Sequence, residues 1–107
     1  MIVRKAAAAL AVGCTVVVKP AEDTPLTALA LAQTSQEAGL PNGVFNVIPA
    51  DRTETAEISK FLCDSHDVDC ISFTGSTDIG KVMDTLHKAK ICRILNLIKK
   101  VGVLCYY

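Results

Sequence analysis

Short apolar runs alternate with helical patterns along most of the chain. These runs, rich in β-branched residues, lie at positions 15–18 (TVVV), 44–48 (VFNVI) and 70–73 (CISF). Continuous apolar runs of this length are typical of parallel strands that are buried on both faces. Because the segments between the runs have the spacing of helices, we predict a βαβαβ arrangement with a parallel sheet. An alanine-rich stretch at 2–12 predicts a further helix ahead of the first strand.

Residues at the ends of these segments support the predicted helices. Thr24 can cap a helix whose first position is Pro25, and Gly39 can end that helix. After the second run, Asp51 and Glu54 have the spacing of a capping pair. The predicted fold class is therefore α/β, a Rossmann-like βαβαβ parallel sheet fragment with flanking helices.

The last quarter of the chain carries two helical stripes that are out of phase. After the third run, Ser76 or Thr77 can cap a helix whose first stripe is formed by Ile79, Val82, Met83 and Leu86. A second stripe is formed by Ile91, Ile94, Leu95 and Ile98. It lies about 120° around a helix from the first, so one straight helix cannot bury both stripes against one sheet. We therefore predict a partial domain at 1–81 and a divergent basic and apolar helical tail at 82–107.

Composition and charge exclude several classes of protein. Half of the 107 residues are hydrophobic, which is unlike a disordered chain. Ten acidic and five basic residues precede Lys81, whereas one acidic and six basic residues follow from there. Only the tail therefore suits an anionic surface, and its basic residues are not interleaved with aromatics, so we expect no nucleic-acid partner. The five cysteines are odd in number and form no C-x-x-C motif, so we expect neither a disulfide framework nor a metal site.

The N-terminus imitates a secretion signal. MIVRK is followed by the apolar AAAALAVGC, and Cys14 resembles the cysteine of a bacterial lipoprotein box. The β-branched residues at 15–18 continue the apolar run, which favours instead a helix that ends at Gly13 and then a strand. We therefore expect an intracellular protein with no targeting segment in this chain. No segment is as long as a membrane span.

The stretch FTGSTDIGKV at 73–82 combines a strand end with a glycine-rich turn. Gly75, Gly80 and Lys81 have the spacing of a phosphate-binding P-loop. Val82 replaces the Ser or Thr that binds Mg²⁺, and Asp78 adds a negative charge, so we reject that interpretation. The dinucleotide fingerprint G-x-G-x-x-G is also absent. A turn that opens a helix can still present N–H groups to a diphosphate, and a plain turn between strand and helix is an equal alternative.

The stretch KPAE at 19–22 lies where the first predicted strand ends. Lys19 and Glu22, held apart by the rigid Pro20, can both hydrogen-bond a ribose diol. A carboxylate there repels a 2′-phosphate, which favours NAD over NADP. The alternative is that both charged residues are solvated surface groups.

Three motifs together resemble the aldehyde dehydrogenase family. They are KAAAALAVGCTVVVKPAEDTPLTALALA at 5–32, GLPNGVFNVIP at 39–49 and ISFTGSTDIGK at 71–81. In this order they are similar to the NAD-binding domain of that family, and above all to the succinate-semialdehyde dehydrogenases within it. The resemblance runs from residue 1 to about residue 81. It implies an NAD(P)-dependent oxidoreductase that converts an aldehyde to a carboxylate.

The resemblance implies contacts for each motif. Residues 19–22 would contact the adenine ribose, Ala50 would lie near the adenosine, and the turn at 75–80 would lie beside the pyrophosphate and nicotinamide. The implied cofactor-binding residues are Lys19, Pro20, Ala21, Glu22, Ala50, Gly75, Ser76, Thr77, Asp78, Ile79 and Gly80. Arg4 resembles the arginine that holds the distal carboxylate of the substrate in the semialdehyde enzymes, a ligand that suits a guanidinium group. The alternative for Arg4 is an exposed base.

The catalytic motifs of the family have no counterpart in this sequence. The nucleophilic cysteine of the family lies in a Gly-Gln-x-Cys context and its general base in Glu-Leu-Gly-Gly, and neither motif occurs here. We therefore assign no catalytic residue and predict a fragment that carries cofactor motifs but does not turn over substrate. For the complete enzyme we expect a dinucleotide and a small aldehyde as ligands, a homo-oligomer, and a mitochondrial or cytosolic location. The alternative is a non-enzymatic product whose basic amphipathic tail, at 88–100, binds a membrane or a partner.

Overall fold

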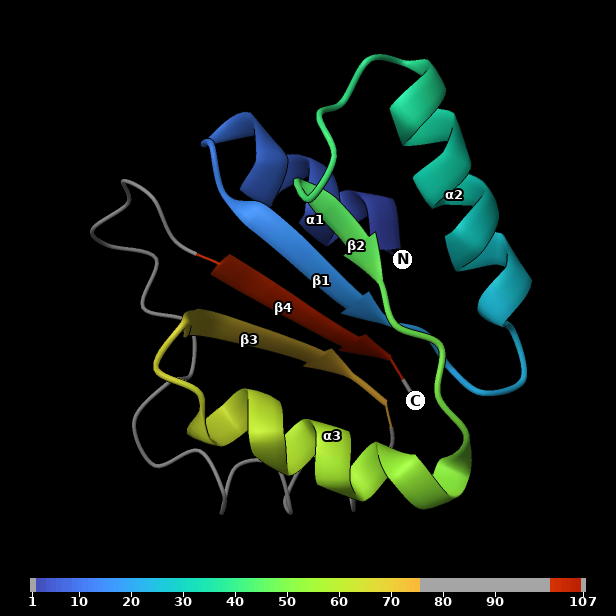
Figure 1. The fold of residues 1–107 in the computed structure, drawn as a ribbon, viewed down its shortest axis with the longest axis vertical. Helices are drawn as coiled ribbons and strands as arrows, with labels where there is room; N and C mark the ends of the chain where they lie inside the picture. Colours follow the sequence, from blue (N-terminus) through green and yellow to red (C-terminus); the bar gives the residue numbers. More distant parts are fainter. Residues whose placement is uncertain (1, 76–100, 107) are drawn as a thin grey trace.

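The order of helices and strands follows the predicted alternation. The structure is a computed structural model, and it describes residues 2–75 and 101–106. The elements are α1 (Ile2–Ala11), β1 (Thr15–Lys19), α2 (Pro25–Glu37), β2 (Phe45–Val47), α3 (Arg52–Asp64), β3 (Val68–Thr74) and β4 (Val101–Tyr106) (Figure 1). All three predicted strands and the three helices predicted within this part of the chain are present.

The strands form a parallel sheet. Among the residues that the structure describes, four strands lie in the order β2-β1-β4-β3. Val18 of β1 is in register with Val47 of β2 on one side and with Leu104 of β4 on the other, and β4 pairs in turn with β3. Every pair is parallel, which confirms the predicted βαβαβ arrangement. The carboxyl ends of all strands therefore lie at one edge of the sheet, and β1 ends there at Lys19 and β3 at Thr74.

The helical tail predicted at 82–107 is wrong for its last residues. Val101–Tyr106 form the strand β4, which is hydrogen-bonded between β1 and β3, so the sheet has four strands within the described residues rather than the predicted three. A strand between two others satisfies its N–H and C=O groups on both sides, and this pairing involves residues too distant in sequence to be predicted from local periodicity. The two predicted helical stripes, at 79–86 and 91–98, lie outside the described residues, as does the basic segment at 88–100.

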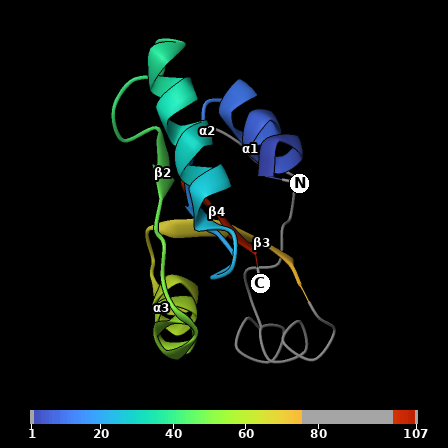
Figure 2. The same cartoon turned by 90° about the vertical axis from the view of Figure 1, so that its right-hand side faces the viewer.

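Helices cover both faces of the sheet. Val16 and Val18 of β1 are completely buried and pack in one cluster with Ala6 of α1. Val17 packs against a second cluster, which includes Leu62 of α3. Successive residues of a strand point to opposite faces, so α1 and α3 cover opposite sides of β1, as its continuous apolar run predicts. Figure 2 shows α1 and α2 at one end of the molecule and α3 at the other.

The helix ends follow the predicted signals with one exception. The Asp51 carboxylate accepts hydrogen bonds from two backbone N–H groups in the first turn of α3, including that of Glu54 at 3.0 Å. Gly39, in the left-handed region at φ +91°, follows the end of α2. Thr24 does not cap α2 with its side chain. Its backbone, at φ −136° and ψ 47°, lies outside the extended conformation that a capping residue adopts.

Candidate functional site

The predicted site residues that the structure describes gather at the carboxyl edge of the sheet. Residues 19–22 include the end of β1 and the loop after it, Ala50 follows β2, and Gly75 follows β3. Ligands of open parallel sheets bind in the crevice outside these strand ends. The fold therefore brings the three sequence motifs to one edge. The remaining predicted residues of the glycine-rich turn, at 76–80, lie outside the described residues, and their contacts stay predictions.

Lys19 is a fixed group at the end of β1. Its side chain is completely buried, and its Nζ donates a hydrogen bond to the carbonyl oxygen of Pro20 at 3.2 Å. A buried ammonium group is tolerated only where hydrogen bonds or an opposite charge replace its water. The alternative that Lys19 is a solvated surface residue is therefore wrong. Pro20 is buried as well, so the chain leaves the strand in a constrained direction.

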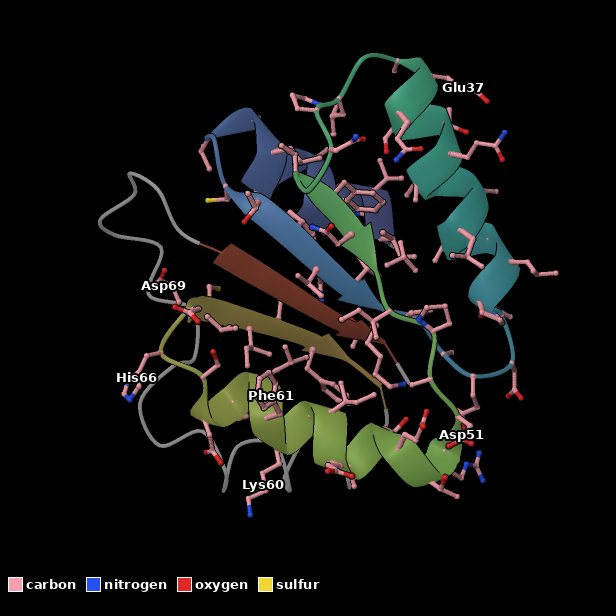
Figure 3. The ribbon with its side chains drawn as sticks, in the orientation of Figure 1. Glu37, Asp51, Lys60, Phe61, His66 and Asp69 are labelled. Carbon is pink, nitrogen blue, oxygen red and sulfur yellow. The ribbon has the colours of Figure 1, made fainter. Side chains whose placement is uncertain are left out.

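Glu22 lies in the turn after β1 and is held by a residue of α3. The Nε of Arg52 donates a hydrogen bond to Glu22 Oε1 at 2.9 Å, and the Glu22 side chain is only 22% exposed. Figure 3 shows the start of α3, marked by Asp51, beside the loop that leaves β1. This ion pair links the first motif to the segment that follows Ala50 and β2.

The surroundings of Glu22 keep its carboxyl group ionised. A backbone hydrogen bond and the hydrogen bond from Arg52 lower the pKa of Glu22, and the charges of Arg52 and Lys19 act in the same direction. Desolvation opposes them without reversing the shift. At neutral pH the site therefore offers an oriented carboxylate, which accepts hydrogen bonds and donates none.

Lys5 is a residue of this edge that the sequence analysis missed. It lies in α1, is half-buried, and its Nζ donates hydrogen bonds to the carbonyl oxygen of Phe73 at 3.3 Å and to the hydroxyl of Thr74 at 2.5 Å. These contacts join α1 to the last residues of β3, directly before Gly75. The partners are 68 and 69 positions away, so local spacing gives no sign of them. The only signal in the sequence is a second cation beside Arg4 in an otherwise apolar helix.

Arg4 is exposed on α1. Because its neighbour Lys5 reaches the end of β3, the first turn of α1 lies at the carboxyl edge of the sheet. Arg4 is therefore an exposed residue in the helical turn nearest to the edge where the motifs gather. Its role toward a substrate carboxylate stays a prediction, and the exposed base stays the alternative.

Gly75 has a steric role at the end of β3. A Cβ atom added to Gly75 would overlap the ring of Phe73. The Phe73 side chain packs against the cluster beneath α3, so it cannot move away without disturbing that cluster. Gly75 is not among the described glycines with a positive φ, so the reason that the structure gives for a glycine here is the space that the neighbouring ring requires.

The part of the chain that the structure describes contains neither a metal-binding cluster nor a membrane-spanning helix. No group of three or more His, Cys, Asp or Glu residues in 2–75 and 101–106 is arranged to hold a metal ion. No helix among these residues is long and apolar enough to cross a membrane. Of the described cysteines, Cys14 and Cys63 are buried and Cys70 is half-buried.

A parallel sheet covered by helices on both faces, with polar groups at its carboxyl edge, is the architecture of nucleotide-binding α/β domains. The sequence model of the aldehyde dehydrogenase family matches residues 1–97. The chain therefore belongs to the aldehyde dehydrogenase family. The match extends beyond position 81, and the domain boundary there stays a prediction.

Within this family, the chain is similar to several succinate-semialdehyde dehydrogenases. The chain is 55% identical over 103 residues to the mitochondrial succinate-semialdehyde dehydrogenase of Rattus norvegicus and 52% identical over 103 residues to that of Homo sapiens. Each alignment covers 96% of this chain and 18% of the relative. The succinate-semialdehyde dehydrogenase [NADP(+)] of Saccharomyces cerevisiae is 55% identical over 83 residues, which are 78% of this chain and 16% of the relative. The chain thus resembles succinate-semialdehyde dehydrogenases and spans less than a fifth of their length.

Proposed function

We propose that this chain forms the adenosine-binding part of an NAD(P)-dependent aldehyde dehydrogenase that oxidises succinate semialdehyde or a similar aldehyde bearing a carboxylate. The names of the relatives from rat, human and yeast support the substrate class. The observation that carries the proposal is the pair of charged groups at the carboxyl edge. Glu22 presents an ionised, oriented carboxylate there, beside the buried Lys19 at the end of β1.

These residues fit the ribose of a dinucleotide. Ribose hydroxyls are hydrogen-bond donors, and a fixed carboxylate is the acceptor that suits them. The Glu22 carboxylate takes this role in our proposal, and Lys19 keeps the end of β1 in place beside it. Ala50, half-buried after β2, leaves room for the adenosine because its side chain is a single methyl group. A 2′-phosphate would meet the negative charge of Glu22, so we propose NAD as the preferred cofactor over NADP.

The other parts of the proposed site lie around this ribose position. Gly75 and the turn at 76–80 would meet the pyrophosphate and the nicotinamide half of the dinucleotide. The nicotinamide ring, when bound, supplies the acceptor for the hydride of the aldehyde. Arg4 would hold the distal carboxylate of the substrate. We assign no catalytic residue to these 107 residues, because neither the cysteine motif nor the glutamate motif of the family occurs in them.

The complete enzyme is the setting in which we propose this function. We propose that it assembles as a homo-oligomer and that it is mitochondrial, since the rat and human relatives carry that word in their names. The exposed apolar side chains of Leu26 on α2 and Phe61 on α3, at 76% and 71%, are consistent with surfaces that further protein covers in the complete enzyme.

Titration of the 107-residue chain with NAD by isothermal calorimetry tests the proposal. Replacement Glu22→Gln removes the charged acceptor, so we expect the Kd for NAD to rise about tenfold, the loss of one hydrogen bond to a charged group. Glu37→Gln, at the exposed end of α2, removes the same charge away from the proposed site and should leave the Kd unchanged. The proposal fails if the wild-type chain does not bind NAD, or if both variants change its Kd equally.

A further inference from the structure

We infer that Arg52 is a residue that determines cofactor specificity. Glu22 disfavours the binding of NADP, and Arg52 reduces this preference for NAD over NADP. The inference rests on the proposed function, because it concerns the ribose that Glu22 would bind. Its starting point is the ion pair between the loop after β1 and the first residue of α3, with Arg52 Nε at 2.9 Å from Glu22 Oε1.

The exposures of the two side chains place the guanidinium group on the solvent side of the pair. The Glu22 side chain is 22% exposed, whereas the Arg52 side chain is 85% exposed. The carboxylate is therefore held against the protein, and the guanidinium group lies outside it, toward solvent. Arg52 also lies two positions after Ala50, the residue proposed to adjoin the adenosine. A ligand that reaches Glu22 from solvent meets Arg52 first.

The bond to Glu22 uses only part of the guanidinium group. It is made through Nε, so the two terminal nitrogens of Arg52 are outside this hydrogen bond. A guanidinium group presents five N–H donors, and a phosphate is among the acceptors it fits best. Arg52 can thus keep its bond to Glu22 and donate to a second anion at the same time.

The charges around the 2′ position decide the cofactor. A hydroxyl there donates to the Glu22 carboxylate, whereas a phosphate there is repelled by it. Arg52 brings one positive charge to hydrogen-bond distance of that carboxylate, and the charge of Lys19 also acts on it. Of these two cations, Lys19 is completely buried and Arg52 is exposed. Arg52 is therefore the more accessible of the two to a 2′-phosphate.

Arg52 also affects NAD in the opposite direction. It occupies one acceptor position on Glu22 Oε1, which a ribose hydroxyl would otherwise be free to use. Because Arg52 also orients Glu22, its removal affects the binding of both dinucleotides, but the freed acceptor position favours NAD and the lost positive charge disfavours NADP. Both effects raise the ratio of the Kd for NADP to the Kd for NAD.

Calorimetric titration with NAD and with NADP at low ionic strength tests this inference. The proteins are the wild-type 107-residue chain, Arg52→Met, which keeps most of the stem and removes the charge, and Lys60→Met as the matched control. Lys60 is an exposed cation of the same helix, beyond its first turns (Figure 3). We expect the Kd ratio to rise about tenfold in Arg52→Met, the size of one close charge interaction near a surface. The ratio should stay unchanged in Lys60→Met.

Further results separate this inference from the proposed function. Arg52→Lys restores the charge and should bring the ratio back toward the wild-type value, which a purely structural role of the arginine stem would not do. An unchanged or lower ratio in Arg52→Met, or an equal rise in Lys60→Met, overturns the inference while NAD binding by the wild type stands. If the wild type binds neither dinucleotide, the proposed function fails, and the inference fails with it.

Discussion

The loop after β1 and the end of β3 lie at the same edge of the sheet, but different parts of the chain hold them. After β1, the buried Lys19 donates to the carbonyl of the very next residue, Pro20. At the end of β3, the carbonyl of Phe73 and the hydroxyl of Thr74 receive hydrogen bonds from Lys5, which belongs to the first helix of the chain. The same loop is also joined to α3 by the ion pair of Glu22 with Arg52, 30 positions away, whereas the end of β3 is joined to a helix 68 positions away.

This difference has consequences for both segments. A proline and a buried lysine impose the direction of the first loop wherever β1 is formed. The end of β3 depends on the correct docking of α1 against the sheet. We therefore expect the end of β3 to be sensitive to substitutions in α1, and the loop after β1 to be sensitive to substitutions at the start of α3.

The largest effect is expected at Gly75. Replacement Gly75→Val places side-chain atoms where the ring of Phe73 lies, and the ring is packed against the cluster beneath α3. We expect the free energy of unfolding to fall by about 2–3 kcal/mol, the upper range for overpacking. Urea denaturation measures it. The double variant with Phe73→Leu should lose less than the sum of the two single variants, and simple additivity would contradict a clash between these two residues.

Lys5 provides the next largest effect. Replacement Lys5→Met removes two hydrogen bonds to the end of β3, and we expect a loss of about 1–2 kcal/mol in unfolding free energy. Hydrogen exchange at the amides of Thr74 and Gly75 should become faster, while exchange around residues 19–22 stays the same. Arg4→Met is the matched control, because it removes the same charge from an exposed neighbouring position. Equal effects of both variants would show that Lys5 does not fix the strand end.

The predictable parts of this fold are those with local causes. The runs at 15–18, 44–48 and 70–73 became β1, β2 and β3, because a buried parallel strand needs apolar residues on both faces. The cap of α3 followed from the position of Asp51 relative to Glu54. The strand β4 was missed, because a strand at the centre of a sheet is defined by partners far away in the sequence.

In the candidate site, too, the residues with local sequence signals were predicted and the long-range contacts were not. The motifs at 19–22 and 75–80 were found because charged residues and glycines follow apolar runs. The ion pair of Glu22 with Arg52 spans 30 positions, and the contacts of Lys5 span more than twice that distance. A side chain's partner at such a separation depends on how the helices pack, and a single sequence carries no periodic signal for it.

The smallest effect concerns pH and the cap of α3. Hydrogen bonds from Thr53 and from the backbone N–H of Glu54 lower the pKa of Asp51. A carboxyl with a lowered pKa in the folded protein stabilises it above the unfolded pKa, and this stability is lost as the pH falls through the folded value. In Asp51→Asn, which keeps a capping oxygen but does not titrate, the urea midpoint should fall less between about pH 7 and about pH 3 than in the wild type.

The wild type, measured in the same series of pH values, is the reference for this pH effect. A wild-type pH dependence in Asp51→Asn would mean that the cap contributes nothing to acid unfolding.

The most direct test of the proposed dinucleotide site is hydrogen exchange of the 107-residue chain with and without NAD, read at single-residue resolution. We predict slower exchange at residues 19–22, around Ala50 and at residues 74–75, because all of these lie at the carboxyl edge of the sheet. The opposite edge, where β1 begins at Thr15 and β3 at Val68, should not change. Protection at that opposite edge, or no protection at any residue, would contradict a dinucleotide site built from these three strand ends.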